Sequence, residues 1–219
     1  MRQRYTSVAP LYDVVSAEWP VYRVGRRLGV PLLHLRPGDT VLDVGCGTGL
    51  NLPLLRRAVG HGTVIGVDSS AQMLAAARRK VPAASAGLVL LRQADATTMA
   101  DRRHAEPALA TGADAVLFTY SLSLMHPWRQ AWDQALSLAR PGARVVVVDM
   151  AVPVGRARLL SPLARLACAL GGADIDAHPW QALVEECSDV SHEEAWGGHI
   201  QVWAGTTAAV QQNAPQTKE

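Results

Sequence analysis

Three glycines at alternate positions follow an apolar run that contains an acid. The segment "VLDVGCGTGLN", residues 41–51, holds Asp43 within the run and Gly45, Gly47 and Gly49 directly after it. Because glycine has no side chain and accepts a positive φ, the backbone of such a loop can lie very close to a ligand. The segment therefore predicts a binding loop between a strand and a helix.

The spacing of these glycines disfavours two common phosphate-binding loops. The dinucleotide fingerprint G-x-G-x-x-G, counted from Gly45, would need glycine where Leu50 stands. A P-loop would need a lysine after its last glycine, and no lysine lies near this segment. A pyrophosphate ligand is therefore disfavoured.

Two further carboxylates follow the next two apolar runs. Asp68 ends "GTVIGVD" and Asp95 follows "GLVLLRQA". Together with Asp43 they would repel a pyrophosphate, but they could accept hydrogen bonds from a ribose diol and an adenine amino group and attract a cationic ammonium or sulfonium. S-adenosylmethionine carries all of these groups, so we expect it as the cofactor.

The apolar pattern places these residues in an α/β fold. Runs 41–44, 64–67 and 145–148 are apolar without alternation, as in parallel strands that helices cover on both faces. Strand and helix alternate, which predicts a doubly wound, Rossmann-like sheet. We expect strands at 40–44, 62–68, 87–95, 113–120 and 143–150, and helices at about 10–34, 50–59, 69–80, 128–140, 155–170 and 179–186. Residues 189–196 and 199–208, joined across Gly197 and Gly198, predict an antiparallel pair.

Four motifs in register resemble those of class I S-adenosylmethionine-dependent methyltransferases. They are "VLDVGCGTGLN", "IGVDSSAQML", "LRQADAT" and "DAVLFTYSLSLM". The resemblance implies a seven-stranded sheet of order 3-2-1-4-5-7-6 with strand 7 antiparallel. We expect a single domain over residues 1–210, in which residues 1–36 form a helical lid. Residues 211–219 have no apolar pattern, so we expect a flexible tail there. The lid segment "RYTSVAPLYD" is similar to that of the ubiquinone and menaquinone methyltransferase branch.

The same resemblance implies a set of cofactor-binding residues. Gly45, Cys46 and Gly47 would line the methionine part, Asp68 would bind both ribose hydroxyls, and Asp95 would accept from the adenine amino group. Asp43 would orient the loop or the amino group, although it could merely anchor the loop, and Met73 could equally belong to the core. The remaining members of the implied set are Gly49, Ser69 beside the adenine, Ala96 next to Asp95, Tyr120 at the end of strand 4, and Tyr12, or less surely Tyr5, in the lid.

The acceptor side offers one histidine as a candidate general base. His126 follows strand 4, where the crevice opens, but a histidine before Pro127 could also simply shape a helix start. His178 is a weaker candidate. Trp180 and Trp196 could form aromatic walls, with core packing favoured for Trp196.

The acceptor class follows from what the chain contains and lacks. The motif [ND]-P-P-[YFW] of enzymes that methylate adenine in DNA or glutamine in proteins is absent, and the corresponding place reads "TYSL". Residues 118–150 resemble small enzymes that N-methylate lipid head groups or related amines. We expect N- or O-methylation of a metabolite or a lipid head group. Transfer of a 3-amino-3-carboxypropyl group, or cofactor binding without catalysis, stays open.

Composition bounds the remaining possibilities. The formal net charge is +2, which does not indicate a nucleic-acid partner. The three cysteines are scattered without ligand spacing, so neither a disulfide framework nor a metal site is expected. No apolar stretch is long enough to span a bilayer, so we expect a cytoplasmic chain without stable membrane insertion. The oligomeric state is open.

Overall fold

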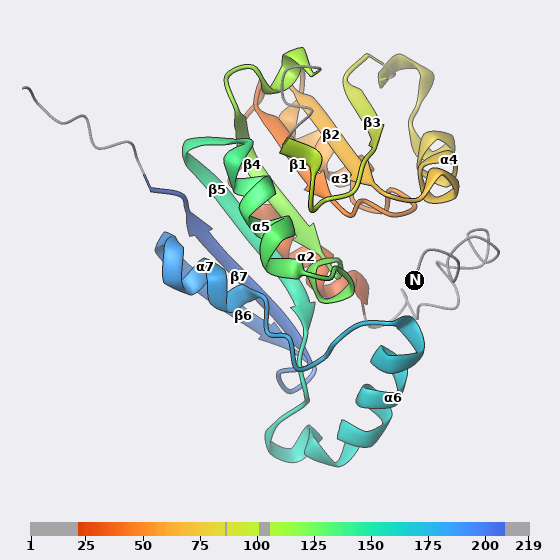
Figure 1. The fold of residues 1–219 in the computed structure, drawn as a ribbon, viewed down its shortest axis with the longest axis vertical. Helices are drawn as coiled ribbons and strands as arrows, with labels where there is room; N and C mark the ends of the chain where they lie inside the picture. The colour runs from red at the N-terminus through yellow and green to blue at the C-terminus, as the bar shows by residue number, and fades with distance from the viewer. Residues whose placement is uncertain (1–21, 86, 101–105, 209–219) are drawn as a thin grey trace, which may run out of the picture.

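The computed structural model describes residues 22–85, 87–100 and 106–208. Tyr5, Tyr12 and the expected tail at 211–219 lie outside the described residues, as does most of the expected lid. The described part folds into one mixed sheet covered by helices (Figure 1). The strands are β1 Thr40–Val44, β2 Thr63–Asp68, β3 Val89–Gln93, β4 Ala113–Thr119, β5 Ala139–Met150, β6 Ser188–Ala195 and β7 Ile200–Thr206.

The sheet has seven strands in the order β3-β2-β1-β4-β5-β7-β6. Strand β1 pairs in parallel with β2 on one side and β4 on the other, and β5 pairs with β7 antiparallel. Both the predicted order and the reversed strand are confirmed. Chain order changes direction at β1 and β4, which is where doubly wound sheets bind ligands at the carboxyl ends of their strands.

Helices cover both faces of this sheet. In Figure 1, α5 and α7 lie in front of it, and α2 and α3 lie behind it. One core contains Phe118, Trp132 and Leu183, and the other contains Leu33, Leu55 and Val148. The helices are α2 Arg23–Leu32, α3 Leu52–Val59, α4 Ala71–Lys80, α5 Trp128–Ser137, α6 Ser161–Gly171 and α7 Trp180–Glu186, with short 3-10 turns η2 Ala83–Ser85, η4 Pro107–Leu109, η5 Leu122–Leu124 and η6 Gly155–Leu160.

Local sequence accounts for the starts of the two helices beside the glycine loop. The hydroxyl of Ser70 accepts a hydrogen bond from the backbone N–H of Met73 at 3.3 Å, which caps α4. Helix α3 begins at Leu52, two residues later than predicted, and its Pro53 lies in the first turn, where it removes no helical hydrogen bond. The residue before α3 is Asn51, whose side chain turns into the protein instead of capping the helix.

The expected end of the helix at residue 140 is wrong. Helix α5 ends at Ser137, and β5 begins at Ala139, so Pro141 and Gly142 lie within the strand range. The carbonyl of Leu138 accepts from the N–H of Ala113 at 2.8 Å, which draws the chain into the sheet immediately after the helix. An irregularity in the β4–β5 pairing accommodates the extra residues before Arg144.

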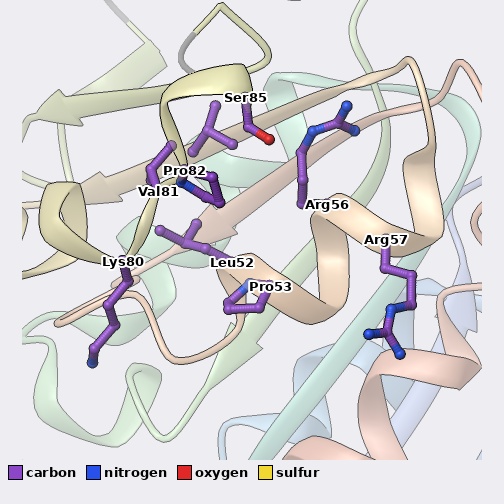
Figure 2. A pocket seen from close by; sticks show the side chains of 9 residues that line it. Leu52, Pro53, Arg56, Arg57, Lys80, Val81, Pro82 and Ser85 are labelled. Carbon is purple, nitrogen blue, oxygen red and sulfur yellow. The ribbon is translucent and has the colours of Figure 1, made fainter.

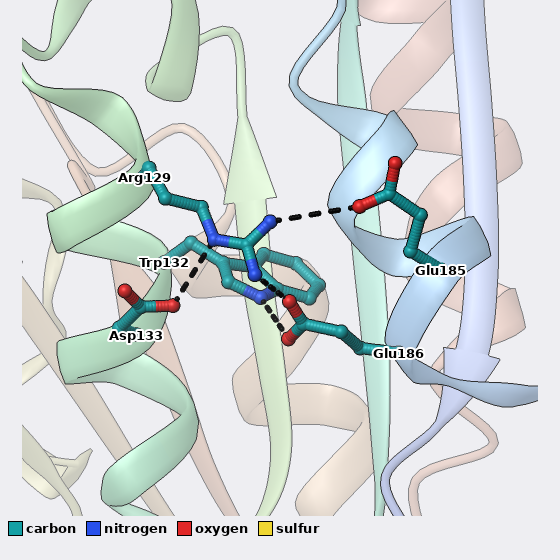
Figure 3. A network of polar contacts seen from close by, with 5 residues as sticks. All are labelled: Arg129, Trp132, Asp133, Glu185 and Glu186. Carbon is teal, nitrogen blue, oxygen red and sulfur yellow. Dashed lines mark hydrogen bonds and ion pairs between the residues drawn. The ribbon is translucent and has the colours of Figure 1, made fainter.

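A polar network joins α5 to α7 on the front face (Figure 3). The indole N–H of the fully buried Trp132 donates to Glu186 Oε2 at 2.8 Å, and Arg129 forms an ion pair with the same carboxylate. Arg129 also contacts Asp133 at 3.3 Å and Glu185 at 3.8 Å. The network satisfies a buried donor and holds α7, the helix that leads into β6.

Candidate functional site

The glycine loop turns over the end of β2. The backbone N–H groups of Gly45 and Cys46 both donate to the carbonyl of Val67, at 2.8 and 2.9 Å. Gly45, Gly47 and Gly49 have φ values of 71°, 54° and 79°. These positive φ values favour glycine at all three positions.

The three glycines have different surroundings. A Cβ at Gly45 would lie 2.6 Å from the Cβ of Ser121, and one at Gly49 would lie 2.6 Å from Leu52 Cδ1. A Cβ at Gly47 would meet nothing within 4 Å. Gly45 and Gly49 therefore allow close packing, whereas Gly47 borders open space in which a ligand can approach the backbone.

Asp68, at the end of β2, supports this loop. Its Oδ2 accepts from the N–H of Gly47 at 2.9 Å, and its Oδ1 accepts from the N–H of Ser70 at 2.8 Å. Burial raises the pKa of the Asp68 carboxyl, and the two backbone hydrogen bonds oppose that shift. Each carboxylate oxygen has two lone pairs, so this geometry is compatible with further hydrogen bonds from a diol.

Asp43 lies behind the loop, with 1% of its surface exposed. Asn51 Nδ2 donates to both of its oxygens, at 3.0 and 3.2 Å, and to Thr119 Oγ1 at 3.2 Å. The side-chain oxygen of Asn51, Oδ1, accepts from the guanidinium of Arg26 in α2 at 3.1 Å. Burial raises the pKa of Asp43 to about 6, against the lowering effects of Asn51 and Arg26. This geometry fits the alternative that Asp43 anchors the loop.

The residues expected around an adenine ring come from three segments. Oδ1 of Asp95 accepts from the N–H and the hydroxyl of Thr97, at 2.9 and 2.7 Å, which orients the exposed carboxylate after β3. Met73 and Ala96 are buried, whereas Ser69 is exposed. Cys46 is buried beside Gly66 of β2, and a Cβ placed on Gly66 would lie 3.0 Å from the Cys46 sulfur. Because its side chain is buried there, Cys46 contributes its backbone to the loop.

Tyr120 connects the end of β4 to α2. Its hydroxyl donates to the carbonyl of Tyr22 at 3.0 Å, and the two rings lie 4.7 Å apart. The Arg26 guanidinium lies 5.5 Å from the Tyr120 ring centroid. Tyr120 therefore joins the end of β4 to α2. The sequence did not indicate this role.

The candidate residues of the acceptor side have different environments. His126 is exposed and follows Met125, whose Cε would lie 3.0 Å from a Cβ at Gly45. His178 contacts Trp180, with ring centroids 5.0 Å apart, and Trp180 is buried. The expectation that Trp196 packs in the core is wrong: it is 53% exposed because it stands at the turn between β6 and β7 with φ 55°.

Sequence reasoning missed the buried polar partners of the site. Asn51 donates to both Asp43 and Thr119, and Arg26 of α2 donates to Asn51. On the other side of β4, the buried Asp149 accepts from the N–H and hydroxyl of Ser123, at 3.1 and 2.7 Å. One signal could have revealed Asn51. It is a polar residue that stands between the glycines and the apolar start of a helix.

A pocket of about 310 Å³ lies behind the loop, between α3 and the segment that follows α4 (Figure 2). Its apolar lining includes Leu52 and Val81, and Arg56 and Lys80 stand at it. Lys80 Nζ donates to Thr48 Oγ1 at 3.1 Å, which links this pocket to the loop. Asp68 and Asp95 are not among the residues that line it.

The chain is similar to known methyltransferases in sequence and in fold. The methyltransferase domain family matches residues 41–143. The 2-phytyl-1,4-naphtoquinone methyltransferase of Synechococcus elongatus is 30% identical over 68% of this chain and 63% of its own length. The demethylmenaquinone methyltransferase of Symbiobacterium thermophilum is 30% identical over 71% of this chain and 61% of its own. A solved methyltransferase from Aquifex aeolicus shares the fold, with a TM-score of 0.60, 17% identity, and coverage of 90% of this chain and 98% of that one.

The fold, the glycine loop and the matched domain define a class I S-adenosylmethionine-dependent methyltransferase. Within this class, the chain is similar to methyltransferases that are named for naphthoquinone and menaquinone substrates. The chain spans slightly more than three fifths of the length of the two relatives described above.

Proposed function

We propose that this chain transfers a methyl group from S-adenosylmethionine to a small-molecule acceptor. The observation that carries the proposal is the pairing of Asp68 with the N–H of Gly47 at 2.9 Å beside open space. The Asp68 carboxylate, which would bind the diol, and the half-buried backbone of Gly47 then stand at one edge of the sheet. The residues present fit this cofactor, because ribose hydroxyls need acceptors and its methionine part needs close backbone approach.

In this proposal the protein aligns its two substrates and excludes water from them. The cofactor supplies an electrophilic methyl group, whose bond electrons return to sulfur as the acceptor forms its new bond and releases a proton. Alignment of such a pair can contribute about 7 to 11 kcal/mol to lowering the barrier. The Asp43–Asn51 pair would fix the loop, Asp68 would fix the ribose, and Asp95 would fix the base.

Among small molecules, we propose a quinol or a related hydroxylated ring as the acceptor. This rests on the relatives, which are named for methyl transfer to a naphthoquinone or to demethylmenaquinone. The N-methylation of a head group that residues 118–150 suggested is the second candidate. A solved phosphoethanolamine N-methyltransferase shares the fold at 14% identity, which supports the fold alone.

Mass spectrometry of the product tests the proposal. The protein would be incubated with methyl-labelled S-adenosylmethionine and a panel of quinols, phenols and amines. We expect a quinol to gain one labelled methyl group. Gain of the larger 3-amino-3-carboxypropyl group would establish the transferase alternative. Tight cofactor binding with no product from any acceptor would instead favour a non-catalytic binder.

His126 remains the predicted general base for an acceptor that must lose a proton. We expect His126→Ala to lower kcat by about tenfold, less than general bases often contribute, because the sulfonium already activates the donor. Cofactor affinity should be unchanged, as measured by calorimetry. His61→Ala is the matched control, because His61 is exposed and lies between α3 and β2. Undiminished activity of His126→Ala from mildly acidic to mildly alkaline pH would remove His126 from this role.

A further inference from the structure

Large apolar side chains are concentrated on the surface of η6 and α6. Leu159 is 89% exposed, Leu163 is 64% exposed, Leu166 is 58% exposed and Leu170 is 77% exposed. Val154 and Leu160, in the same segment, are 58% and 59% exposed. A contiguous apolar surface of this kind marks an interaction site more often than scattered single residues do.

Helix α6 has two apolar faces, and the core uses one of them. Ala164 and Cys168, four residues apart, are buried, and the Cys168 sulfur lies 3.6 Å from that of Met150. Leu163, Leu166 and Leu170 follow one another at intervals of three and four residues and form a second stripe. Packing against the sheet therefore explains the first face but leaves the leucine stripe in solvent.

Within the segment that carries the leucine stripe, the charged residues are of one sign. Residues 154–172 contain Arg156, Arg158 and Arg165 and no acid. Arg165 pairs with Asp176, which lies beyond the helix. Arg156 and Arg158 line a hollow of about 610 Å³ together with Gly155, Leu159 and Pro162. An apolar face flanked by arginines complements the acyl boundary and the anionic head groups of a membrane surface.

We propose that η6 and α6 dock on an anionic lipid bilayer, with the leucine stripe in the acyl boundary and Arg156 and Arg158 at the lipid phosphates. A second copy of the chain is a poorer occupant for two reasons. An eleven-residue helix is only about 16 Å long, which is short for the roughly 800 Å² per partner of a stable dimer. A symmetric contact would also bring like-charged arginines together.

The position of α6 relates this docking to substrate access, and this part of the inference rests on the proposed function. Helix α6 follows β5 at the end of the molecule where that strand terminates (Figure 1). The glycine loop and Asp68 lie at the same carboxyl edge of the parallel strands. No helix within the described residues is long and apolar enough to cross a membrane. Docking would therefore let a lipid-borne acceptor reach the site from the bilayer surface.

Vesicle co-sedimentation of the full chain tests the proposal. We expect binding to vesicles of phosphatidylcholine with about a third phosphatidylglycerol, weak binding to phosphatidylcholine alone, and a loss of binding at high salt. Leu163→Glu/Leu166→Glu should lower the partition by about tenfold to a hundredfold. Arg156→Ala/Arg158→Ala should lower it by about tenfold on anionic vesicles only, and it serves as a second test if the leucine variant folds poorly.

Leu54→Glu/Val184→Glu is the matched control, because these residues are 38% and 46% exposed and lie on α3 and α7. It should bind vesicles as the unmodified chain does. Equal binding of the leucine variant, or a dimer that this variant dissociates, would overturn the proposal. So would a full chain that binds neither vesicle, as expected if residues 1–21 cover the stripe.

Calorimetry with S-adenosylhomocysteine on the same samples keeps this proposal separate from the function proposed above. Vesicle binding without cofactor binding would contradict only the methyltransferase proposal. Cofactor binding with no vesicle binding would contradict only the docking.

Discussion

Asp68→Ala is expected to weaken S-adenosylmethionine binding by about 10²- to 10⁴-fold. Two hydrogen bonds from the ribose to a carboxylate contribute about 1.5 to 3 kcal/mol each, and alanine removes both. The variant also loses the acceptor for Gly47 N–H, so the loop itself would be less ordered. Isothermal titration calorimetry with S-adenosylmethionine and S-adenosylhomocysteine measures the change.

Asp133→Ala provides the control for this measurement. Asp133 is an exposed carboxylate on α5, in ion-pair contact with Arg129 and on another face of the molecule. Its removal should leave cofactor affinity unchanged. An unchanged dissociation constant for Asp68→Ala in a folded protein would refute the ribose assignment, and circular dichroism would establish that the fold is retained.

The second large effect concerns pH and the buried Asp43. Its pKa is raised from 3.8 to about 6 in the folded protein, so the folded state binds this proton more tightly than the unfolded state does. The free energy of unfolding therefore falls as pH rises from about 4 to about 6, by up to about 3 kcal/mol from this group. Asp43→Asn cannot ionise, so its stability relative to the unmodified chain should rise over that interval.

Chemical denaturation of both proteins without cofactor, on either side of this pH interval, tests the expectation. Asp149→Asn is a matched variant, because Asp149 is also buried and its pKa is also raised to about 6. Both substitutions should flatten the pH dependence. Curves that run parallel to that of the unmodified chain would show that Asp43 does not titrate in this range.

The sequence was sufficient for the sheet and for the parts of the site that depend on strand ends. Asp68 follows a buried parallel strand, and the carboxyl ends of such strands meet at one edge, so its place was predictable from the pattern alone. The glycine loop was predictable for the same reason. The antiparallel pairing of β6 with β7 followed from two short runs joined by Gly197 and Gly198, whereas the reversal of β7 in the sheet came from the family resemblance.

Contacts between distant segments could not be predicted in this way. Arg26 and Asn51 are 25 positions apart, and nothing in the local pattern of either residue indicates the other. Pro141 and Gly142 follow the helix predicted to end at residue 140, and such turn residues have the same local preference whether they end a helix or sit in an irregular strand pairing. Core packing is favoured for a tryptophan, but the position of Trp196 in the β6–β7 turn decides its exposure.

The close approach of α2 to the sheet has a consequence for the evolution and engineering of the chain. A Cβ at Gly25 would lie 2.7 Å from Val148 and 2.1 Å from the Tyr120 hydroxyl, and one at Gly29 would lie 2.5 Å from Val148. Larger residues at either position would lift the helix and pull Arg26 away from Asn51. Ligand affinity would thus depend on how closely α2 packs against the sheet, and random mutagenesis should recover affinity variants at this interface.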